Sequence, residues 1–549
     1  MKNKINKLIL LITILFVLLS CVVDNDHQWT PKILDDNSEI FLPNFSFAGY
    51  QWGEKEIPQL KPTLNVSDYG AIANDGKDDT KALLKAMKAA HKIDEPVVLK
   101  FPSGKFILND VLYIQRSNFV LQGSGSRENG TIIYISKPLN ELGRIPEELI
   151  ELEEYLRLNN KRQREPKRGI DEPFSLYAWS GGYIWVGPKG ERAKTYLQKY
   201  NKPENELAVI TSGKRGEHNF TVKNSSKLSV GMLIRINWYN KDGEQSSLIE
   251  HMYDGKDIQI GSRHWESPEM PLIKQEVTIT NIIGNRVTIK EPLMHDLKPE
   301  WFNRITEWNY LEQVGIEHIR FEFPEDEYFA HHLEAGYNAI YFTNASHSWI
   351  KDVSFKNGDS GFISDVCSNC TIENVTIEGR KYHYAVQFGD VYNMLAKQIY
   401  VNAEIWHSLS FNTGARSSVF TNCKVTVLPS LDQHSGANHQ NLFDNVKLIE
   451  NTRNRSFFYV GGDGYWAPTH GAFSTFWNVE IEYNFPNPNN DTLKIKGVHN
   501  GPSARLVGIH ANYPLSITYG PDAYIEGINR KNISVVSLYN YQLEKRISR

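Results

Sequence analysis

The sequence predicts an all-β fold, a solenoid of the parallel β-helix type. A four-residue phrase recurs between residues 336 and 479: an apolar residue, any residue, an amide or acid, and usually a β-branched residue. Its third position is occupied by Asp352, Asn374, Gln398, Asn422, Asn445 and Asn478. These positions are spaced by 22, 24, 24, 23 and 33 residues. A period in the low twenties, carried by short β-rich runs, is typical of one solenoid coil per repeat.

The same register aligns residues elsewhere in each coil. Counting back 15 positions from four successive amides reaches Asp359, His383, His407 and Ser430. Counting back six positions reaches Ser368, Tyr392, Arg416 and His439. Because neighbouring coils lie about 4.8 Å apart, we expect Asp359, His383 and His407 to form a column of titratable groups on one flank. The amides themselves are interpreted as a structural hydrogen-bonded ladder.

Charge and cysteine content limit the partners and cofactors. A net charge of -4 over 549 residues predicts no nucleic-acid partner, so any basic site for an acidic substrate has to be local. Beyond Cys21 the chain holds only Cys367, Cys370 and Cys423, and we expect buried thiols rather than disulfides. A lone C-x-x-C is a weak metal signal. No metal site or cofactor is therefore predicted, with Ca²⁺ left open as an alternative.

The first residues predict an export signal with a lipid attachment site. A basic start precedes a short apolar run over residues 8–19, and residues 18–21 resemble a bacterial lipobox. We expect residues 1–21 to be a lipoprotein signal peptide with the lipid on Cys21; an ordinary signal peptide is the alternative. The expected location is the bacterial cell envelope, at the outer membrane, the cell surface or the periplasmic face. The lipid would be the only membrane contact.

Residues 64–137 are predicted to form an N-terminal cap and the first coils. Residues 68–71 read Asp-Tyr-Gly-Ala, residues 75–80 read Asp-Gly-Lys-Asp-Asp-Thr, and residues 101–104 read Phe-Pro-Ser-Gly. A helix capped by Thr80 is expected between the last two motifs. This segment closely resembles the cap of the pectate-lyase-like superfamily. The resemblance implies a right-handed parallel β-helix with a helical cap and a carbohydrate-active, polysaccharide-lyase-like enzyme, although hydrolases and phage tailspikes share the signature.

The remaining boundaries follow changes of pattern. Residues 22–63 are predicted to be a tether, and residues 138–310 an inserted α/β region, with a helical excursion followed by a small β region. Regular coils are expected over residues 311–533. Residues 534–549 are predicted to form a helical cap that closes the open end of the solenoid. The protein is expected to act as a monomer.

Candidate catalytic residues concentrate in the loops beside the predicted column. β-Elimination from a uronate needs a base for the C5 proton, an acid for the leaving oxygen and a group that neutralises the carboxylate. Histidine suits the base, tyrosine suits either proton role, and Lys or Arg binds a carboxylate. We predict catalytic roles for His383, His407, Tyr384, Arg416, Lys381, His434 and His439.

Other polar and aromatic residues are assigned to binding or to structure. Predicted substrate contacts are Asp359, Trp406, Asp432, Trp466 and His470. Histidines interpreted as structural are His318, His331, His332 and His347. For Arg416, binding to backbone carbonyls at a turn is the alternative.

The predicted function is cleavage of an acidic, uronate-containing polysaccharide or oligosaccharide by β-elimination. Hydrolysis is the main alternative, because acidic side chains are available, although the N-T-D, D-D and G-H-G pattern of polygalacturonases is absent. An oligosaccharide dehydratase that uses the same eliminative chemistry also stays open. So does a non-catalytic surface glycan-binding protein.

Overall fold

A computed structural model describes most of the chain. The described residues are 27–191, 205–243, 246–256, 270–452, 456–461, 467–497 and 501–548. The predicted signal peptide, the lipidation site Cys21 and the predicted substrate contact Trp466 lie outside them. No helix within the described ranges is long and apolar enough to cross a membrane.

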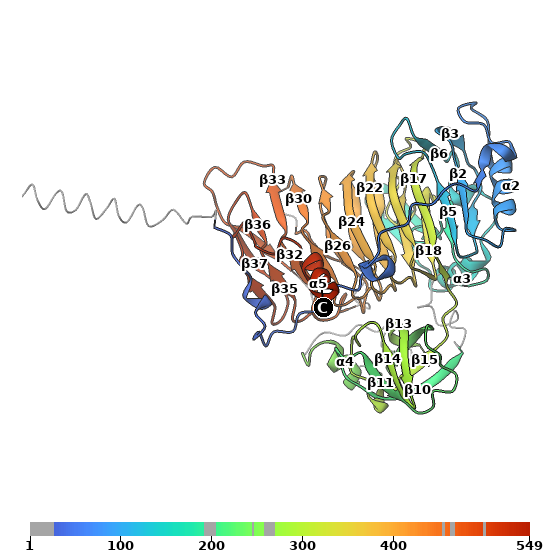
Figure 1. Cartoon of the computed structure of the whole chain (residues 1–549). Coiled ribbons are helices and arrows are strands. Elements are labelled where there is room, and N and C mark those ends of the chain that lie inside the picture. The colour runs from blue at the N-terminus through green and yellow to red at the C-terminus, as the bar shows by residue number, and fades with distance from the viewer. Residues whose placement is uncertain are drawn as a thin grey trace, which may run out of the picture.

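The chain forms a right-handed parallel β-helix, as predicted (Figure 1). An eight-stranded sheet forms one side; its strands are β4 (Leu112–Ile114), β9 (Ile184–Val186), β18 (Asn338–Thr343), β21 (Ser360–Asp365), β23 (Tyr382–Gly389), β25 (Ile405–Phe411), β28 (Leu431–His434) and β31 (Phe458–Gly461). An 18-stranded sheet forms the rest; its strands are β1 (Leu64–Asn65), β2 (Val97–Lys100), β3 (Gly104–Ile107), β5 (Phe119–Gln122), β6 (Thr131–Tyr134), β17 (Val314–Glu322), β20 (Trp349–Lys356), β22 (Thr371–Glu378), β24 (Leu395–Asn402), β26 (Val419–Thr421), β27 (Lys424–Val425), β29 (Leu442–Asp444), β30 (Lys447–Glu450), β32 (Thr475–Trp477), β33 (Glu480–Tyr483), β35 (Arg505–Val507), β36 (His510–Ala511) and β38 (Tyr524–Glu526).

The amide of the repeated phrase marks a bend in the longer sheet. All six amide or acid positions have positive φ, for example 54° at Asn374 and 58° at Gln398. This left-handed conformation is tolerated best by Gly, Asn and Asp, which explains the residue type. The side chains also form the predicted ladder: Asn374 Nδ2 donates to Asp352 Oδ1 at 3.1 Å, and Asn445 Nδ2 donates to Asn422 Oδ1 at 2.6 Å.

The core runs along the solenoid axis, because inward strand positions repeat in every coil. Phe420, Phe443 and Phe476 stack on one another, with ring centroids 5.9 and 5.4 Å apart. Helix α2 (Thr80–Ala90) covers the N-terminal end and buries Leu83 and Met87 against the first coils. The predicted N-terminal cap is therefore present.

The N-terminal segment from residue 27 to 57 is not a tether. Trp29, Phe45 and Tyr50 are buried, and residues 29–48 pack with helix α5 (Leu538–Ile547) against the outer face of the longer sheet. Residues at the ends of several strands, such as Leu442 at the start of β29 and Trp477 at the end of β32, pack against this segment and supply an apolar surface for it. The same contact places α5 on the side of the solenoid instead of its open end, because this apolar face needs a cover.

The predicted insertion at 138–310 contains a strand of the solenoid. β9 pairs in parallel with both β4 and β18, so the insertion consists of two separate excursions. The first carries helix α3 (Ile150–Leu158) and a hairpin of β7 (Arg162–Glu165) and β8 (Ile170–Pro173). The second forms a small closed barrel with its own core; its elements are β10 (Glu206–Gly213), β11 (Asn219–Val222), β12 (Leu233–Tyr239), α4 (Ser247–Met252), β13 (Pro271–Ile283), β14 (Arg286–Ile289) and β15 (Arg304–Thr306).

Candidate active site

The register of the eight-stranded sheet differs by one residue from the prediction. Tyr384, and not His383, pairs with His407 across β23 and β25. The turn before β23 spans residues 379–381, whereas the turn before β25 spans residues 403–404 only. The count back from the amide crosses the segment that follows each strand, and this segment is one residue longer after β25: Gln398 lies 10 positions after Phe388, whereas Asn422 lies 11 positions after its partner Phe411. The count therefore carries the wrong residue into the pair.

Histidine side chains gather on the outer side of this sheet despite the shift. His383 and His407 have ring centroids 5.3 Å apart, and His434 lies 4.5 Å from His407. The ring of Tyr384 stacks on both, at 4.2 Å from His383 and 4.9 Å from His407. Five rings, which we call the histidine cluster, lie together; they are His331, His332, His383, His407 and His434.

Two members of the cluster were predicted to be structural. His331 and His332 come from the loop between β17 and β18, which also supplies Glu334. A sequence signal existed: this connection spans residues 323–337, and the equivalent connections before β21, β23 and β25 are a few residues long. Loops that lengthen one coil of a solenoid on one face often carry function.

Each central histidine is held by a buried carboxylate. His383 Nδ1 lies 3.0 Å from Glu334 Oε1, and His407 Nδ1 lies 3.1 Å from Asp432 Oδ2. Ser410 Oγ donates to the same Asp432 oxygen at 2.6 Å. All of these side chains are almost fully buried, so the two imidazole–carboxylate pairs have fixed orientations. Asp432 was predicted to contact substrate, but its side chain is buried and orients His407.

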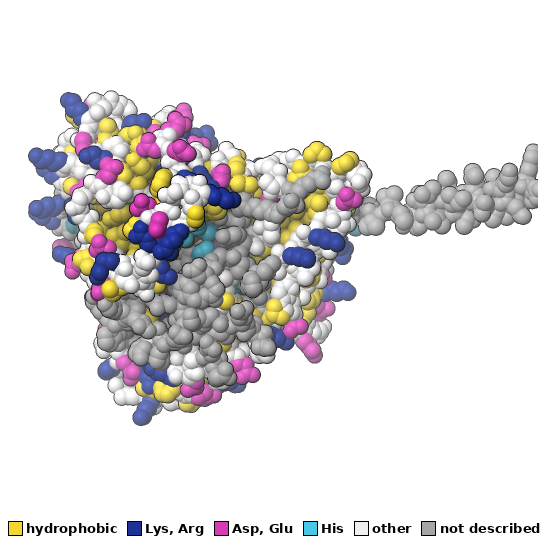
Figure 2. All heavy atoms as spheres, turned by 180° about the vertical axis from the view of Figure 1, so that it is seen from behind, with side chains coloured by type: hydrophobic (Ala, Val, Ile, Leu, Met, Phe, Trp, Pro, Cys, Tyr) yellow, Lys and Arg dark blue, Asp and Glu magenta, His cyan; other side chains and the backbone are white. Residues whose placement is uncertain are grey.

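Partly exposed residues surround the buried pairs. Trp406 stacks on His331 at 4.9 Å, and Lys381 Nζ lies 4.0 Å from the centre of the Trp406 ring. Lys381 also pairs with Glu404 at 2.6 Å. Figure 2 shows histidine side chains reaching the surface close to a group of Lys and Arg side chains. These residues form the mouth of the site.

A groove of about 1150 Å³ adjoins the cluster at Glu334. It lies between the first excursion and the long loop, and its lining includes Tyr177, Phe329 and Arg157. Lys161 and Arg162, from the basic run over residues 161–168, line it as well. An aromatic and basic lining suits an acidic sugar chain.

Burial changes the ionisation of the cluster. Loss of hydration lowers the pKa of His383 well below its ordinary value and lowers that of His332 to about 3. Burial also raises the pKa of Glu334 to about 8, although the Tyr328 hydroxyl opposes the shift. For Asp432 burial acts in the same direction, but the neighbouring His407 and His434 outweigh it and hold its pKa below the ordinary range.

Asp359 supports the long loop and is not placed to bind substrate. Its Oδ2 accepts hydrogen bonds from the backbone N–H groups of Gly336 and Tyr337, both at 2.9 Å, and its Oδ1 accepts one from Arg380 at 2.6 Å. The side chain is buried. These bonds fix the end of the loop that carries His331, His332 and Glu334.

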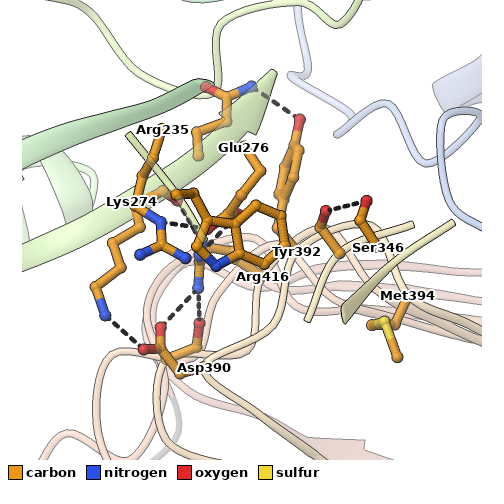
Figure 3. Close-up of polar contacts among 12 residues, drawn as sticks. Arg235, Lys274, Glu276, Ser346, Asp390, Tyr392, Met394 and Arg416 are labelled. Carbon is orange, nitrogen blue, oxygen red and sulfur yellow. Dashed lines mark hydrogen bonds and ion pairs between the residues drawn. The ribbon is translucent and has the colours of Figure 1, made fainter. Parts of the chain in front are cut away.

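Arg416 does not act as a carboxylate clamp. It lies in a column of residues at the turn before each strand of the longer sheet, which we call the turn stack: Ser346, Ser368, Tyr392, Arg416 and His439. The inserted barrel covers Arg416, which is only 2% exposed. Its guanidinium contacts Glu276 at 3.2 Å and Asp390 at 3.1 Å, and donates to the backbone carbonyls of Lys274 and Gly414 (Figure 3). The alternative role at backbone carbonyls is thus the observed one.

His439 and His470 are buried as well. His439 Nε2 lies 2.9 Å from His295 Nε2 of the second excursion, and its Nδ1 contacts the Ala437 carbonyl at 2.9 Å. His470 Nε2 accepts a hydrogen bond from the Gly501 N–H at 2.8 Å. Neither ring belongs to the histidine cluster, so the predicted catalytic role of His439 and substrate contact by His470 find no support in the geometry.

Two groups within the described ranges have donor atoms close enough to hold a metal ion. One consists of His331, His332 and His383, and the other of His407, Asp432 and His434. Within each group the donor atoms lie within 4.8 Å of one another. Imidazole nitrogen suits Zn²⁺, Cu, Fe and Ni, whereas Ca²⁺ takes oxygen ligands. Neither group fits the Ca²⁺ alternative.

Comparison with known proteins supports the resemblance in the cap. The profile of the family described as rhamnogalacturonase A/epimerase, pectate lyase-like, matches residues 63–141. No curated protein sequence matches the chain.

Solved structures resemble the chain at low identity. The tailspike protein gp49 from Pseudomonas phage LKA1 shares 12% identity, with 85% of this chain and 81% of that chain covered and a TM-score of 0.45. The A-module of the Azotobacter vinelandii mannuronan C-5 epimerase AlgE4 shares 11%, with 85% and 97% covered and a TM-score of 0.34. The Yersinia enterocolitica family 28 exopolygalacturonase shares 12%, with 87% and 79% covered and a TM-score of 0.33.

Proposed function

We propose that the protein cleaves an acidic, uronate-containing polysaccharide or oligosaccharide by β-elimination at the histidine cluster. The observation that carries this proposal is the pair of buried imidazole–carboxylate contacts, His383 with Glu334 and His407 with Asp432, whose imidazole rings both contact the Tyr384 ring. The match of the cap to a pectate-lyase-like family supports a carbohydrate substrate. The groove beside Glu334 supports an extended one.

His407 is the proposed base. Donation of its Nδ1–H to Asp432 leaves the lone pair on Nε2, which can accept the C5 proton of the uronate. The electrons of the C5–H bond then form the C4–C5 double bond, and the bond between C4 and the glycosidic oxygen breaks. Tyr384 would protonate that oxygen; its hydroxyl accepts a hydrogen bond from Asn412 Nδ2 at 3.1 Å. Lys381 and Trp406 at the mouth would bind the carboxylate and one sugar face.

Hydrolysis is the second candidate, and one observation favours it. Glu334 has its pKa raised to about 8 and Asp432 has its pKa lowered, so two carboxyl groups of one site differ in ionisation. Glycosidases use a protonated carboxylic acid beside an ionised carboxylate, which acts as the base in inverting enzymes and as the nucleophile in retaining enzymes.

A screen of uronate polymers separates the two reactions. We expect ultraviolet absorbance from the C4–C5 double bond to rise together with reducing ends. Reducing ends without absorbance would establish hydrolysis and reject elimination. Binding without either product would reject catalysis and indicate a glycan-binding protein.

We also propose that the mature protein is anchored in the bacterial envelope by a lipid on Cys21. The lipobox-like residues 18–21 support this proposal. A Cys21→Ser variant should be released from the membrane fraction, and mass spectrometry of the wild type should show the added acyl mass. An unmodified wild-type cysteine would reject the anchor.

A further inference from the structure

Three imidazoles of the cluster face one another across a small space. His331 Nε2 lies 3.1 Å from His383 Nε2, and the donor atoms of His331, His332 and His383 all lie within 4.8 Å of one another. Two nitrogens bound to one tetrahedral Zn²⁺, each about 2.0–2.1 Å from the metal, lie about 3.3 Å apart. The observed separation therefore already matches the spacing of two ligands.

Glu334 lies against one of these rings, on the side away from His331. Its Oε1 lies 3.0 Å from His383 Nδ1, so a proton on this nitrogen would face Glu334 and leave the Nε2 lone pair facing His331. Metal-bound histidines almost always donate the other ring N–H to a carboxylate, a carbonyl or water.

The backbone places the other two rings on the same side. Consecutive side chains of an extended chain point in opposite directions. His332 has a φ of 65°, which breaks this alternation, and the rings of His331 and His332 stack at 3.9 Å. Both rings consequently approach His383, at centroid distances of 4.6 and 5.6 Å.

We propose that His331, His332 and His383 bind a divalent transition-metal ion of the Zn²⁺ class, with a fourth position open to a substrate oxygen. Three protein ligands and one open position are typical of catalytic zinc sites. The ion's role rests on the proposed function: it would bind the uronate carboxylate together with Lys381, a task that buried Arg416 cannot perform. His407 is not one of these three ligands and keeps its proposed role as the base.

Metal binding is tested directly and without any substrate. Chelator-treated full-length protein is titrated with Zn²⁺ by calorimetry and with Co²⁺ by visible absorption. We expect one equivalent to bind, with a Co²⁺ spectrum typical of four-coordinate nitrogen ligation. His332→Ala should abolish this site, and Glu334→Gln should weaken it about 10–100-fold. His318→Ala, which changes a histidine paired with Asp352 outside the cluster, should bind like the wild type.

Three results would overturn the metal site. These are no binding by wild-type protein, unchanged stoichiometry in His332→Ala, and loss of binding in His434→Ala with His332→Ala unaffected. Circular dichroism of each variant shows whether it is folded, and Glu334→Gln, which preserves size, covers the case in which His332→Ala does not fold. Elimination activity is read separately by absorbance, so a protein that binds Zn²⁺ but cleaves no uronate rejects the proposed function and retains the site.

Discussion

The histidine cluster and the turn stack are two columns in the same coils, with different surroundings. His383 and His407 of the cluster, like the residues of the stack, recur at a fixed distance from the amide ladder, and both groups contain histidine. In the cluster, His383 and His407 lie beneath a partly exposed mouth formed by Lys381 and Trp406. In the stack, Arg416 is covered by the inserted barrel and saturated by carboxylates and carbonyls.

The difference shows that a repeat predicts which residues align but not what covers them. Arg416 faces Glu276 and Lys274, which lie more than 130 positions earlier in the chain. His383 faces Glu334, from a loop of another coil. In each case the partner comes from an excursion outside the repeat, and that partner decides whether the group is available to a substrate.

The largest expected effect is a difference in elimination rate when a histidine is replaced by alanine in each column. His407→Ala should lower the elimination rate per folded molecule about 10²–10⁴-fold, because the base is lost. His439→Ala should keep its rate per folded molecule, because this ring contacts His295 and not the cluster. Initial rates of double-bond absorbance check both. Equal losses in the two variants would contradict the division between the columns.

Loss of the buried guanidinium should act on stability. Arg416→Met removes the cation between Glu276 and Asp390, and we expect the free energy of unfolding to fall by about 3 kcal/mol. The matched control is Arg162→Met, which removes an exposed pair with Asp171 and should cost less than about 1 kcal/mol. Denaturant unfolding measures both. An Arg416→Met protein that is as stable as the wild type but inactive would contradict the structural role and indicate that Arg416 acts in the active site.

The buried carboxyl group of Glu291, in the second excursion, should make the free energy of unfolding depend on pH. Burial raises the pKa of Glu291 to about 7, although Thr278 N–H and Trp52 Nε1 donate to it. Because the folded pKa lies above the unfolded value of about 4.5, this contribution is full below pH 4.5 and is lost as pH rises through 7. One pKa unit is worth about 1.4 kcal/mol, so the loss amounts to about 3 kcal/mol.

Glu291→Gln isolates this contribution. Unfolding free energies of the wild type and the variant, measured between pH 4.5 and 7.5, should differ by an amount that changes with pH as described. Parallel pH curves for the two proteins would show that Glu291 does not titrate in this range.

The smallest effect is expected at the solvent-exposed ladder. Asn422 has a φ of 54° and accepts a hydrogen bond from Asn445 at 2.6 Å. Asn422→Ala should lower the unfolding free energy by about 1–2 kcal/mol, because alanine is strained at positive φ and the bond is lost. Asn422→Gly also removes the hydrogen bond, but glycine adopts positive φ without strain. This variant should therefore be less destabilised than Asn422→Ala. Thermal unfolding of both variants separates the two causes.

The candidate site was predictable only in part. His383, His407, Tyr384, Lys381, Trp406, Asp432 and His434 were singled out from their loops, and the structure brings them together. His331 and His332 were missed because nothing in the repeat tells on which side a long loop folds. Their signal was the unusual length of residues 323–337 between two strands.

The solenoid, its N-terminal cap and the ladder could be predicted from the sequence because they depend on local rules. A fixed period aligns strands, and positive φ selects Asn or Asp at the bend. Tertiary structure decided the one-residue register shift at Tyr384, the packing of residues 27–57 and the cover over Arg416. These features depend on contacts between segments far apart in the chain. The free energy gained by burying such surfaces cannot be predicted from any single repeat.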